Sequence, residues 1–553
     1  MTSRCAAQPS AIQVTDAVVV GAGPNGLVAA NHLADAGWSV VVLESGSEPG
    51  GAVRTGEITL PGFRHDLFSA FYPLAVASPA IRRLELEDHG LRWRHFPLVL
   101  AHPLLDGRCA TISMDVEATA ASVGGFAAGD ASAWKTMIDG WARLEEPFID
   151  SLLSPFPPVR SALRLGARLG AMGSLRLARH ALLPVRRMTE ELFTGVGAGL
   201  LLGGSALHAD LTPEAPGSGL YGWLLACLGQ RFGFPVPEGG AGNLTAALVR
   251  RLRSMGGEVV CDSRVERVVI RRGRAVGVEV RGQGVFAARR AVLADVNAPV
   301  LYRDLVGEEH LPAGVLEDLG RFQWDTATVK VDWALRRPVP WAASDAGLAG
   351  TVHIADDFNN LTEFCSHLAM GLLPARPFLL FGQQSVGDPT RSPAGTETAW
   401  AYTHVPRRLL GDGAGVLDVS GDHGDPRWLV GFVERIEDRI ERLAPGFRES
   451  ILGRHVFAPV GMQAENPNLD LGAIGGGTAQ LHQQLVFRPV PGFGRPETPI
   501  AGLYLASSSA HPGGGVHGAA GANAARAALL PLRRTRSVLL GRGHSPSTTR
   551  PTG

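Results

Sequence analysis

The chain has 553 residues, of which 45% are hydrophobic and 19% charged, a composition typical of a globular protein with a large core. It carries 52 basic and 52 acidic side chains, so its formal net charge is zero and no overall positive field would collect nucleic acid. The five cysteines include no CxxC pair, which argues against a disulfide framework, a metal site and a redox-active disulfide.

The first 16 residues lack the charged start and apolar core of a secretory signal peptide. A chain without paired cysteines also suits a reducing compartment. We therefore expect a cytoplasmic protein, and the only membrane contact we consider is a peripheral one, described below.

Residues 16–55 predict a strand, a glycine turn, a helix and a second strand. A β-branched run at 17–20 is followed at once by a GxGxxG motif and a helical pattern. In this motif the glycines allow a tight turn, close approach of a pyrophosphate and close packing of the helix, whose first amides face the anion. The predicted dinucleotide loop consists of Gly21, Gly23, Pro24, Asn25 and Gly26.

The second strand, 39–43, ends at Glu44. A carboxylate at this place can accept both hydroxyls of an adenosine ribose and repels a 2′-phosphate. NADP is therefore disfavoured as the ligand of this loop.

A paired glycine, Gly50-Gly51, and the basic Arg54 follow the acid. Here the sequence resembles the flavoprotein superfamily of monoamine oxidases and bacterial carotenoid desaturases, in which a paired glycine and a basic residue hold FAD. Many members carry arginine where this chain has Ala52, so the resemblance assigns the basic role to Arg54. It implies FAD as the cofactor.

His65 and Asp66 precede an aromatic-rich run, 67–72. In the related flavoproteins this segment passes close to the flavin, so the resemblance makes both residues candidates for the site. The alternative is a His-Asp pair that satisfies a buried turn.

Residues 79–236 show helical periodicities and predict a largely helical insert. Within it, 192–206 is apolar but too short and too glycine-rich to span a membrane, so we expect buried core or a tunnel wall. A further GxGxxG at 217–222 follows prolines rather than a strand, and predicts only the start of a helix.

Residues 159–188 hold seven arginines and no acid, and Arg160, Arg164 and Arg168 fall on one helical face beside leucines. A basic amphipathic segment of this kind can lie on an anionic bilayer. Alternatively, the leucines pack on the insert while the arginines face water or pair with distant acids. Glycines in the segment weaken a continuous helix.

From 237 onwards the chain predicts a helix at 244–255 and strands at 258–261, 265–270, 275–281 and 288–293. This order resembles the second nucleotide-domain segment of the same superfamily, which implies that the backbone of Val265 contacts the adenine. An ordinary core valine is the alternative. Residues 301–455 then return to mixed structure, with a strand at 326–335 and a helix at 428–443.

The C-terminal stretch 502–518 places another GxGxxG after a strand, but no acid follows that could hold a ribose. A helix N-terminus there suits the flavin ring, whose N1 and C2 carbonyl become negative on reduction. The GLYLxxxxxHPGGGV ending resembles carotenoid desaturases and, more closely, the group of pyridine nucleotide-disulfide oxidoreductase domain-containing protein 2. The resemblance implies flavin contacts at Gly513, Gly514, Gly515, Val516 and Gly518, with His511 and His517 as further candidates near the flavin.

The predicted fold class is α/β, with a Rossmann-type FAD-binding domain interleaved with a mixed, largely helical substrate domain. The FAD-binding segments are 1–78, 237–300 and 456–532, the substrate segments are 79–236 and 301–455, and a disordered tail covers 533–553.

The predicted function is oxidation of an apolar substrate (a polyene, isoprenoid or lipid) by hydride transfer from a C–H bond to flavin N5. An amine oxidase and a flavin-stabilised regulatory or binding protein without turnover are the alternatives. No catalytic acid or base and no oligomeric state follow from the sequence.

Overall fold

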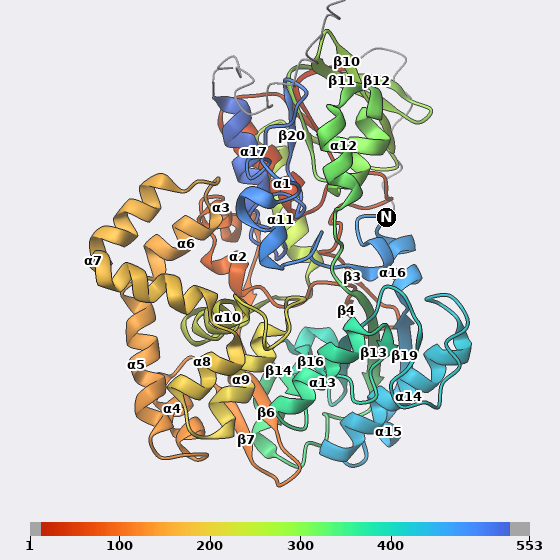
Figure 1. The fold of residues 1–553 in the computed structure, drawn as a ribbon. Helices are drawn as coiled ribbons and strands as arrows, with labels where there is room; N and C mark the ends of the chain where they lie inside the picture. Colours follow the sequence, from red (N-terminus) through yellow and green to blue (C-terminus); the bar gives the residue numbers. More distant parts are fainter. Residues whose placement is uncertain (1–12, 531–553) are drawn as a thin grey trace, which may run out of the picture.

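In the computed structural model, which describes residues 13–530, the chain passes repeatedly between two seven-stranded sheets (Figure 1). The tail predicted to be disordered, 533–553, lies outside the described residues.

The first sheet has the strand order β10-β11-β12-β1-β2-β9, and β20 pairs with β12. Parallel pairing joins β20, β12, β1, β2 and β9, so segments far apart in the sequence meet side by side. The central parallel strands β1 and β2 contribute to hydrophobic cores on both faces of the sheet and are mostly apolar, whereas the edge strand β10 exposes Glu266, Arg267 and Arg271. Its strands are β1 Gln13–Val20, β2 Val40–Leu43, β9 Glu258–Val260, β10 Val265–Arg271, β11 Arg274–Val280, β12 Gly284–Ala294 and β20 Leu503–Leu505.

Three helices share one hydrophobic core with one face of this sheet: α1 Pro24–Asp35, α11 Gly242–Ser254 and α17 Ala519–Leu529. Helix α17 crosses α1 closely, because a Cβ on Gly518 would come within 2.7 Å of Val28. The observed elements confirm the predicted Rossmann-type α/β fold, with boundaries shifted by one to four residues.

The second sheet has the order β19-β13-β17-β16-β14-β6-β7. Helix α14, Pro426–Leu443, packs on one face through Trp428 and Phe432, which meet Trp333 and Phe381 of the sheet in one core. Its strands are β6 Leu98–Pro103, β7 Cys109–Ile112, β13 Ala327–Leu335, β14 Ala349–Ile354, β16 Leu379–Gln383, β17 Glu397–Val405 and β19 Ile451–Phe457.

Strands β6 and β7 come from the segment that the sequence predicts to be largely helical. They are short and joined by a tight turn in which Gly107 has φ +86°, so too few residues alternate for the pattern to stand out. The proposed domain limits stay predictions.

Apart from β6, β7 and the two-residue strand β5 Trp93–Arg94, the insert is mainly helical, and its longer helices gather at the left of Figure 1. They are α4 Val116–Gly124, α5 Asp130–Ala142, α6 Glu145–Leu153, α7 Val159–Leu182, α8 Val185–Leu192, α9 Val196–Ala206 and α10 Ser218–Phe232. Every residue of α9 from Gly197 onward is buried, as the prediction of a core segment requires. Helix α10 starts directly after Gly217, which confirms the predicted helix start. Within residues 13–530 no helix is both long and apolar enough to cross a membrane.

Candidate active site

The first glycine loop has the backbone that a dinucleotide motif requires. Gly21 has φ +93°, and a Cβ there would lie 2.7 Å from the carbonyl oxygen of Asp295. Helix α1 begins at Pro24, so its first amides point out of the loop. The Gly26 amide donates to a carboxyl oxygen of Asp295 at 2.8 Å, so one amide at this helix end already has an acidic side chain as its partner.

Asp295 is a site residue that the sequence analysis missed. Burial, helped by the charge of Glu44, raises its pKa to about 7. It follows β12, whose end lies beside the end of β1 because Ala294 is paired with Val20 in parallel register. A polar residue at the carboxyl end of a neighbouring parallel strand was the available signal.

Glu44 is fixed at the end of β2 by the backbone. One carboxylate oxygen accepts from the Ala22 amide and the other from the Gly46 amide, both at 2.8 Å. Because an ionised carboxylate offers about four acceptor positions, it can still accept ribose hydroxyls. The Ser263 amide donates to the Glu44 carbonyl at 2.7 Å, so the chain leading to Val265 runs beside the acid, as an adenine contact requires.

The paired glycines pack against the first glycine loop. The Gly50 amide donates to the Ala22 carbonyl at 2.9 Å, and a Cβ on Gly51 would lie 3.1 Å from the Cα of Gly23. Arg54 is tied down nearby, because it donates to the Gly51 carbonyl at 3.1 Å and pairs with Glu465 at 3.2 Å. Its contact with FAD stays a prediction.

The C-terminal glycine loop leaves room beside its backbone. Gly514 and Gly515 are exposed and Val516 is half-buried, although Gly513 and His517 on either side are buried. Two exposed glycines in a buried surrounding provide the flat, open backbone surface that a flavin ring needs. The loop therefore fits the predicted cofactor.

Gly518 and the two candidate histidines hold this loop in place. Gly518 caps α17, while His517 accepts from the Ala519 amide at 3.0 Å and lies 3.2 Å from the Gly513 carbonyl. His511 contacts the Ser154 carbonyl at 3.0 Å. Burial lowers the pKa of both imidazoles to about 4, so they are neutral at ordinary pH and bind backbone. These contacts support a positioning role for both.

Arg488 is buried against the same loop and binds backbone carbonyls next to it. Its role was not visible in the sequence. It is 1% exposed and donates to the carbonyls of Gly475 at 2.8 Å, Thr478 at 2.9 Å and Ser508 at 2.7 Å. Because the hydrogen bonds of this buried guanidinium go to carbonyls alone, Arg488 fixes the geometry of the loop and does not form an ion pair.

The other two candidates, His65 and Asp66, do not pair with each other. Asp66 accepts from the Thr55 hydroxyl at 2.9 Å and the Ala241 amide at 2.7 Å, and forms an ion pair with Arg391. His65 lies 2.8 Å from the Thr59 hydroxyl. Asp66 therefore joins three distant segments, and its direct contact with a flavin or substrate stays a prediction.

His65 instead contacts a buried charge pair on the inner face of the second sheet, which is the face that points away from α14. Its Nδ1 lies 3.4 Å from Asp332, which in turn pairs with Lys330; both are side chains of β13 and at most 1% exposed. Burial opposes ionisation, but Lys330 and His65 lower the pKa of Asp332. Two charges at i and i+2 of an otherwise apolar strand share one face, which was the sequence signal for this cluster.

Aromatic side chains line the same region. The Ser69 amide donates to the Ala52 carbonyl at 3.0 Å, so the aromatic run lies beside the paired glycines. Phe71 then packs on Trp400 of β17 at 5.8 Å, and Trp400 stacks on Tyr402 at 6.0 Å. Phe71, Trp400 and Tyr402 thus form an aromatic cluster between the segment beside the paired glycines and the second sheet.

Comparison with known proteins agrees with this geometry. The family described as NAD(P)-binding Rossmann-like domain matches residues 19–84. Rat pyridine nucleotide-disulfide oxidoreductase domain-containing protein 2 is 30% identical, with 94% of each chain covered. Hydroxyneurosporene desaturase of Cereibacter sphaeroides is 28% identical over 94% of this chain and 98% of its own. Phytoene desaturase (neurosporene-forming) of Rhodobacter capsulatus is 26% identical over 93% and 94%.

Solved structures share the fold. An oxidoreductase from Methanosarcina mazei has a TM-score of 0.58 at 17% identity and covers 92% of this chain and 99% of its own. Putrescine oxidase bound to putrescine has a TM-score of 0.56 at 16% identity, with 93% and 98% covered.

The fold and the relatives define an FAD-dependent oxidoreductase that is similar to the phytoene desaturases. Within that class, the chain belongs to the family of pyridine nucleotide-disulfide oxidoreductase domain-containing protein 2, which resembles the phytoene desaturases.

Proposed function

We propose that the protein is a desaturase or dehydrogenase that removes hydride from a C–H bond of an apolar polyene, isoprenoid or lipid. Bound FAD supplies the acceptor for the hydride at N5. The glycine loops hold the cofactor, and the aromatic side chains of 67–72 and β17 would orient the substrate and exclude water. The observation that carries the proposal is the position of Lys330.

Lys330 occupies the place where an amine substrate would find aromatic faces. Its ammonium lies 5.7 Å from the ring centroid of Trp400 and 6.0 Å from that of Phe457. A second cation in this buried space would lose those faces and meet a like charge. An uncharged substrate is therefore favoured over an amine, and the names of the desaturase relatives support the same choice.

Anaerobic mixing of the FAD-loaded protein with a lipid extract tests this proposal. We expect bleaching of the visible flavin absorbance, with mass spectrometry showing a consumed apolar component that has lost two hydrogens. A panel of primary and secondary amines serves as the comparison. Bleaching by amines, and none by the lipid fraction, would replace the proposal with amine oxidation.

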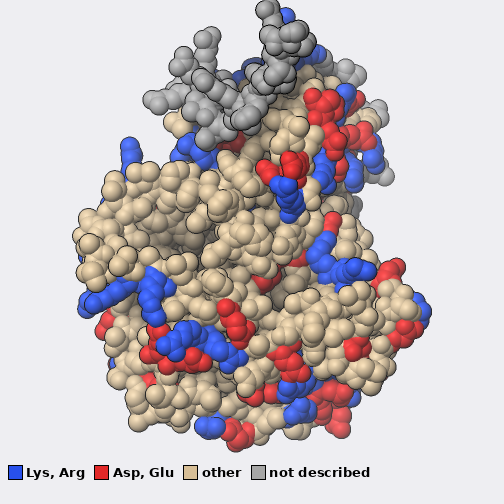
Figure 2. All heavy atoms as spheres, in the orientation of Figure 1, with Lys and Arg blue, Asp and Glu red and all other residues tan. Residues whose placement is uncertain are grey.

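We further propose that α7 lies on a membrane surface when substrate is taken up. Support comes from apolar side chains on this helix that are 57–68% exposed, namely Val159, Leu163, Met172, Leu175 and Leu182. Figure 2 shows a broad uncharged surface over this lobe, with basic side chains at its margin and a hollow beside it. Gly170, at φ +65°, bends the helix.

The arginines of the segment are partly engaged with acids, as the alternative interpretation expects. Arg164 pairs with Asp150 at 3.1 Å and Arg168 with Glu146 at 3.4 Å. Exposed pairs of this kind contribute about 1 kcal/mol or less, so lipid phosphates can replace the acids.

Flotation with anionic liposomes at low and high salt separates the two interpretations. We expect salt-sensitive binding that is lost when Arg160, Arg164 and Arg168 are changed to Glu. The matched control changes three exposed arginines of the other lobe, Arg264, Arg271 and Arg272, to Glu. Equal loss in both variants, or no binding by the unchanged protein, would exclude docking through α7.

A further inference from the structure

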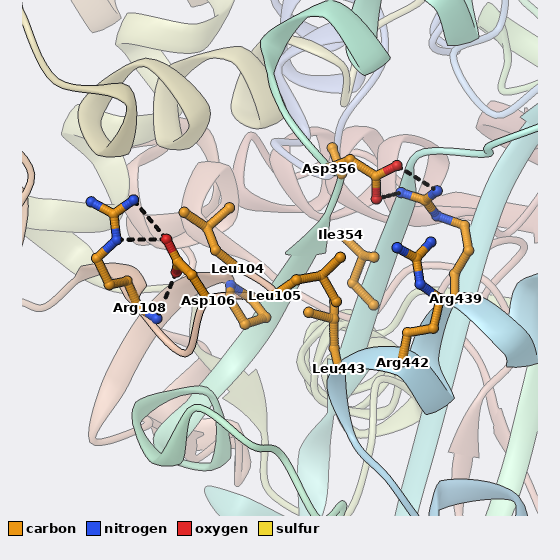
Figure 3. A pocket seen from close by; sticks show the side chains of 11 residues that line it. Leu104, Leu105, Asp106, Arg108, Ile354, Asp356, Arg439, Arg442 and Leu443 are labelled. Atoms are coloured by element: carbon orange, nitrogen blue, oxygen red, sulfur yellow. Dashed lines mark hydrogen bonds and ion pairs between the residues drawn. The ribbon is translucent and has the colours of Figure 1, made fainter.

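A pocket of about 330 Å³ opens at the far edge of the second sheet, away from the glycine loops (Figure 3). Three elements enclose it: the turn between β6 and β7, the residues that follow β14, and the last turn of α14. Pockets that bind small molecules start at about this volume. None of its lining residues takes part in the contacts of the candidate active site.

Arg439 forms the buried polar wall of the pocket. It is 6% exposed, and one terminal nitrogen donates to Asp356 and to Asn360, each at 3.1 Å. Its Nε is buried and has no hydrogen-bond partner. An unsatisfied buried donor on a charged group is costly, so this wall of the pocket carries a positive charge that its partners satisfy only in part.

The pocket also carries more positive than negative charge. Asp356 is shared, because Arg376 binds it at 3.1 Å in addition to Arg439. Arg442, one turn beyond Arg439 on α14, is exposed and lines the pocket. Its side chain makes no ion pair or hydrogen bond with any of the described residues 13–530. Figure 3 shows the Arg439 and Arg442 side chains rising from the same helix toward Asp356.

Part of the pocket lining is apolar. Leu104, Leu105, Ile354 and Leu443 line it, and Leu105 is 56% exposed. The remaining arginine, Arg108, is already engaged, since it pairs with Asp106 at 2.7 Å and stacks over a phenylalanine ring. Of the three arginines in the lining, Arg442 is therefore the one whose side chain is exposed and without a partner among the described residues, and leucine side chains line the same pocket.

We propose that this pocket binds a small organic anion with a short apolar chain, its carboxylate or phosphate head held by Arg442 beside the positive charge of Arg439. Guanidinium groups bind both kinds of head through paired, charge-assisted hydrogen bonds. The chain of the ligand covers Leu105 and its neighbours, which removes exposed apolar surface from water. The site is separate from the proposed substrate space.

Calorimetric titration of the FAD-loaded protein tests the proposal with hexanoate and hexyl phosphate, and with hexan-1-ol as the uncharged probe. We expect saturable binding of at least one anion and none of the alcohol. The two anions tell a carboxylate site from a phosphate site. Absence of binding by both up to about 10 mM, an affinity near the weak end of specific binding, would overturn the proposal.

Variants locate the site. Arg442→Gln should weaken anion binding by about tenfold or more, because it removes a charged donor from an exposed position that does not support the fold. Arg408→Gln, which changes an exposed arginine outside the pocket, is the matched control and should leave binding unchanged. Leu105→Ala should weaken binding of the longer chain but not of acetate. Equal affinities in R442Q and the unchanged protein would place the anion elsewhere and refute the assignment.

Discussion

The two halves of this protein build their parts of the site in different ways. In the FAD-binding half, the backbone forms the site: Gly21, Gly51 and Gly515 all have positive φ, and amides and glycine surfaces shape the space for the cofactor. In the substrate half, side chains form it: Lys330 and Asp332 make a charge pair that is buried on an otherwise apolar strand and is contacted by His65 of the FAD-binding half.

This difference decides which part of the site can be predicted from a short segment of the sequence. A backbone cradle needs glycine at fixed short spacings, so one segment of sequence displays it. A side-chain cluster needs only that the topology brings charges together, and its members can be hundreds of residues apart. The halves should also fail differently when changed, by loss of cofactor in one and by loss of stability in the other.

The largest expected effect concerns the charge that ties the halves together. Asp66→Asn leaves Arg391 buried with Asp388 alone at 3.2 Å, and breaking a buried ion pair costs roughly 3–5 kcal/mol. Urea unfolding of the FAD-loaded protein should show this loss in the free energy of unfolding. Glu238→Gln breaks the partly exposed Arg94–Glu238 pair and should cost about 1 kcal/mol or less. Similar losses in both variants would contradict the structural role of Asp66.

The next effect belongs to the cofactor half alone. Glu44→Ala removes hydrogen bonds to a charged acceptor, so we expect FAD binding to weaken by roughly 1.5–3 kcal/mol, or about 10- to 150-fold. Titration of the apoprotein with FAD, followed by flavin fluorescence, measures the change. Glu48→Ala is the control, because the Glu48 side chain is 58% exposed and only pairs with Arg54 at 3.6 Å. If E44A retained FAD as tightly as E48A, the predicted contact between Glu44 and the ribose would be refuted.

The same contrast explains how far the sequence could lead. Residues 16–55 predicted strand, loop, helix and acid correctly, because glycine spacing and hydrophobic periodicity are local properties. Asp295 was missed although it contacts Gly26, since only the pairing of β12 with β1 brings them together. Lys330 and Asp332 were passed over as part of an apolar strand. Their partner His65 was named as a candidate, but its contact with Asp332 crosses from one domain to the other and leaves no trace in spacing.

A smaller effect separates backbone strain from crowding at the C-terminal loop. Gly515 has φ +105°, and a Cβ there would lie 2.8 Å from the side chain of Leu74. Gly492 has φ +87° with nothing within 4 Å, so it is a matched control. Both Gly515→Val and Gly492→Val should cost roughly 1–3 kcal/mol of stability from strain. Only G515V should also lose flavin or its reduction, which spectroscopy of the purified variants would show; equal flavin content and reduction rates would take this loop out of the site.

The last prediction uses pH to compare the two halves directly. Burial raises the pKa of Asp295 to about 7 and that of Glu397, in the second sheet, to about 8. A carboxyl with a raised folded pKa stabilises the fold fully below its unfolded pKa of about 4 and loses that contribution as pH rises through the folded value. Both groups therefore make the apoprotein progressively less stable as the pH rises from about 4, up to about pH 7 for Asp295 and about pH 8 for Glu397.

Only Asp295, however, lies at the helix end that should receive the FAD phosphates. Its ionisation adds a negative charge there, and unit charges about 4 Å apart in water repel by about 1 kcal/mol. FAD should thus bind several-fold more weakly at the upper pH. Asp295→Asn should abolish this dependence while keeping an acceptor for the Gly26 amide, whereas Glu397→Gln should leave it in place and flatten only the stability profile. An unchanged pH slope of FAD affinity in D295N would show that the carboxyl and the cofactor do not share that helix end.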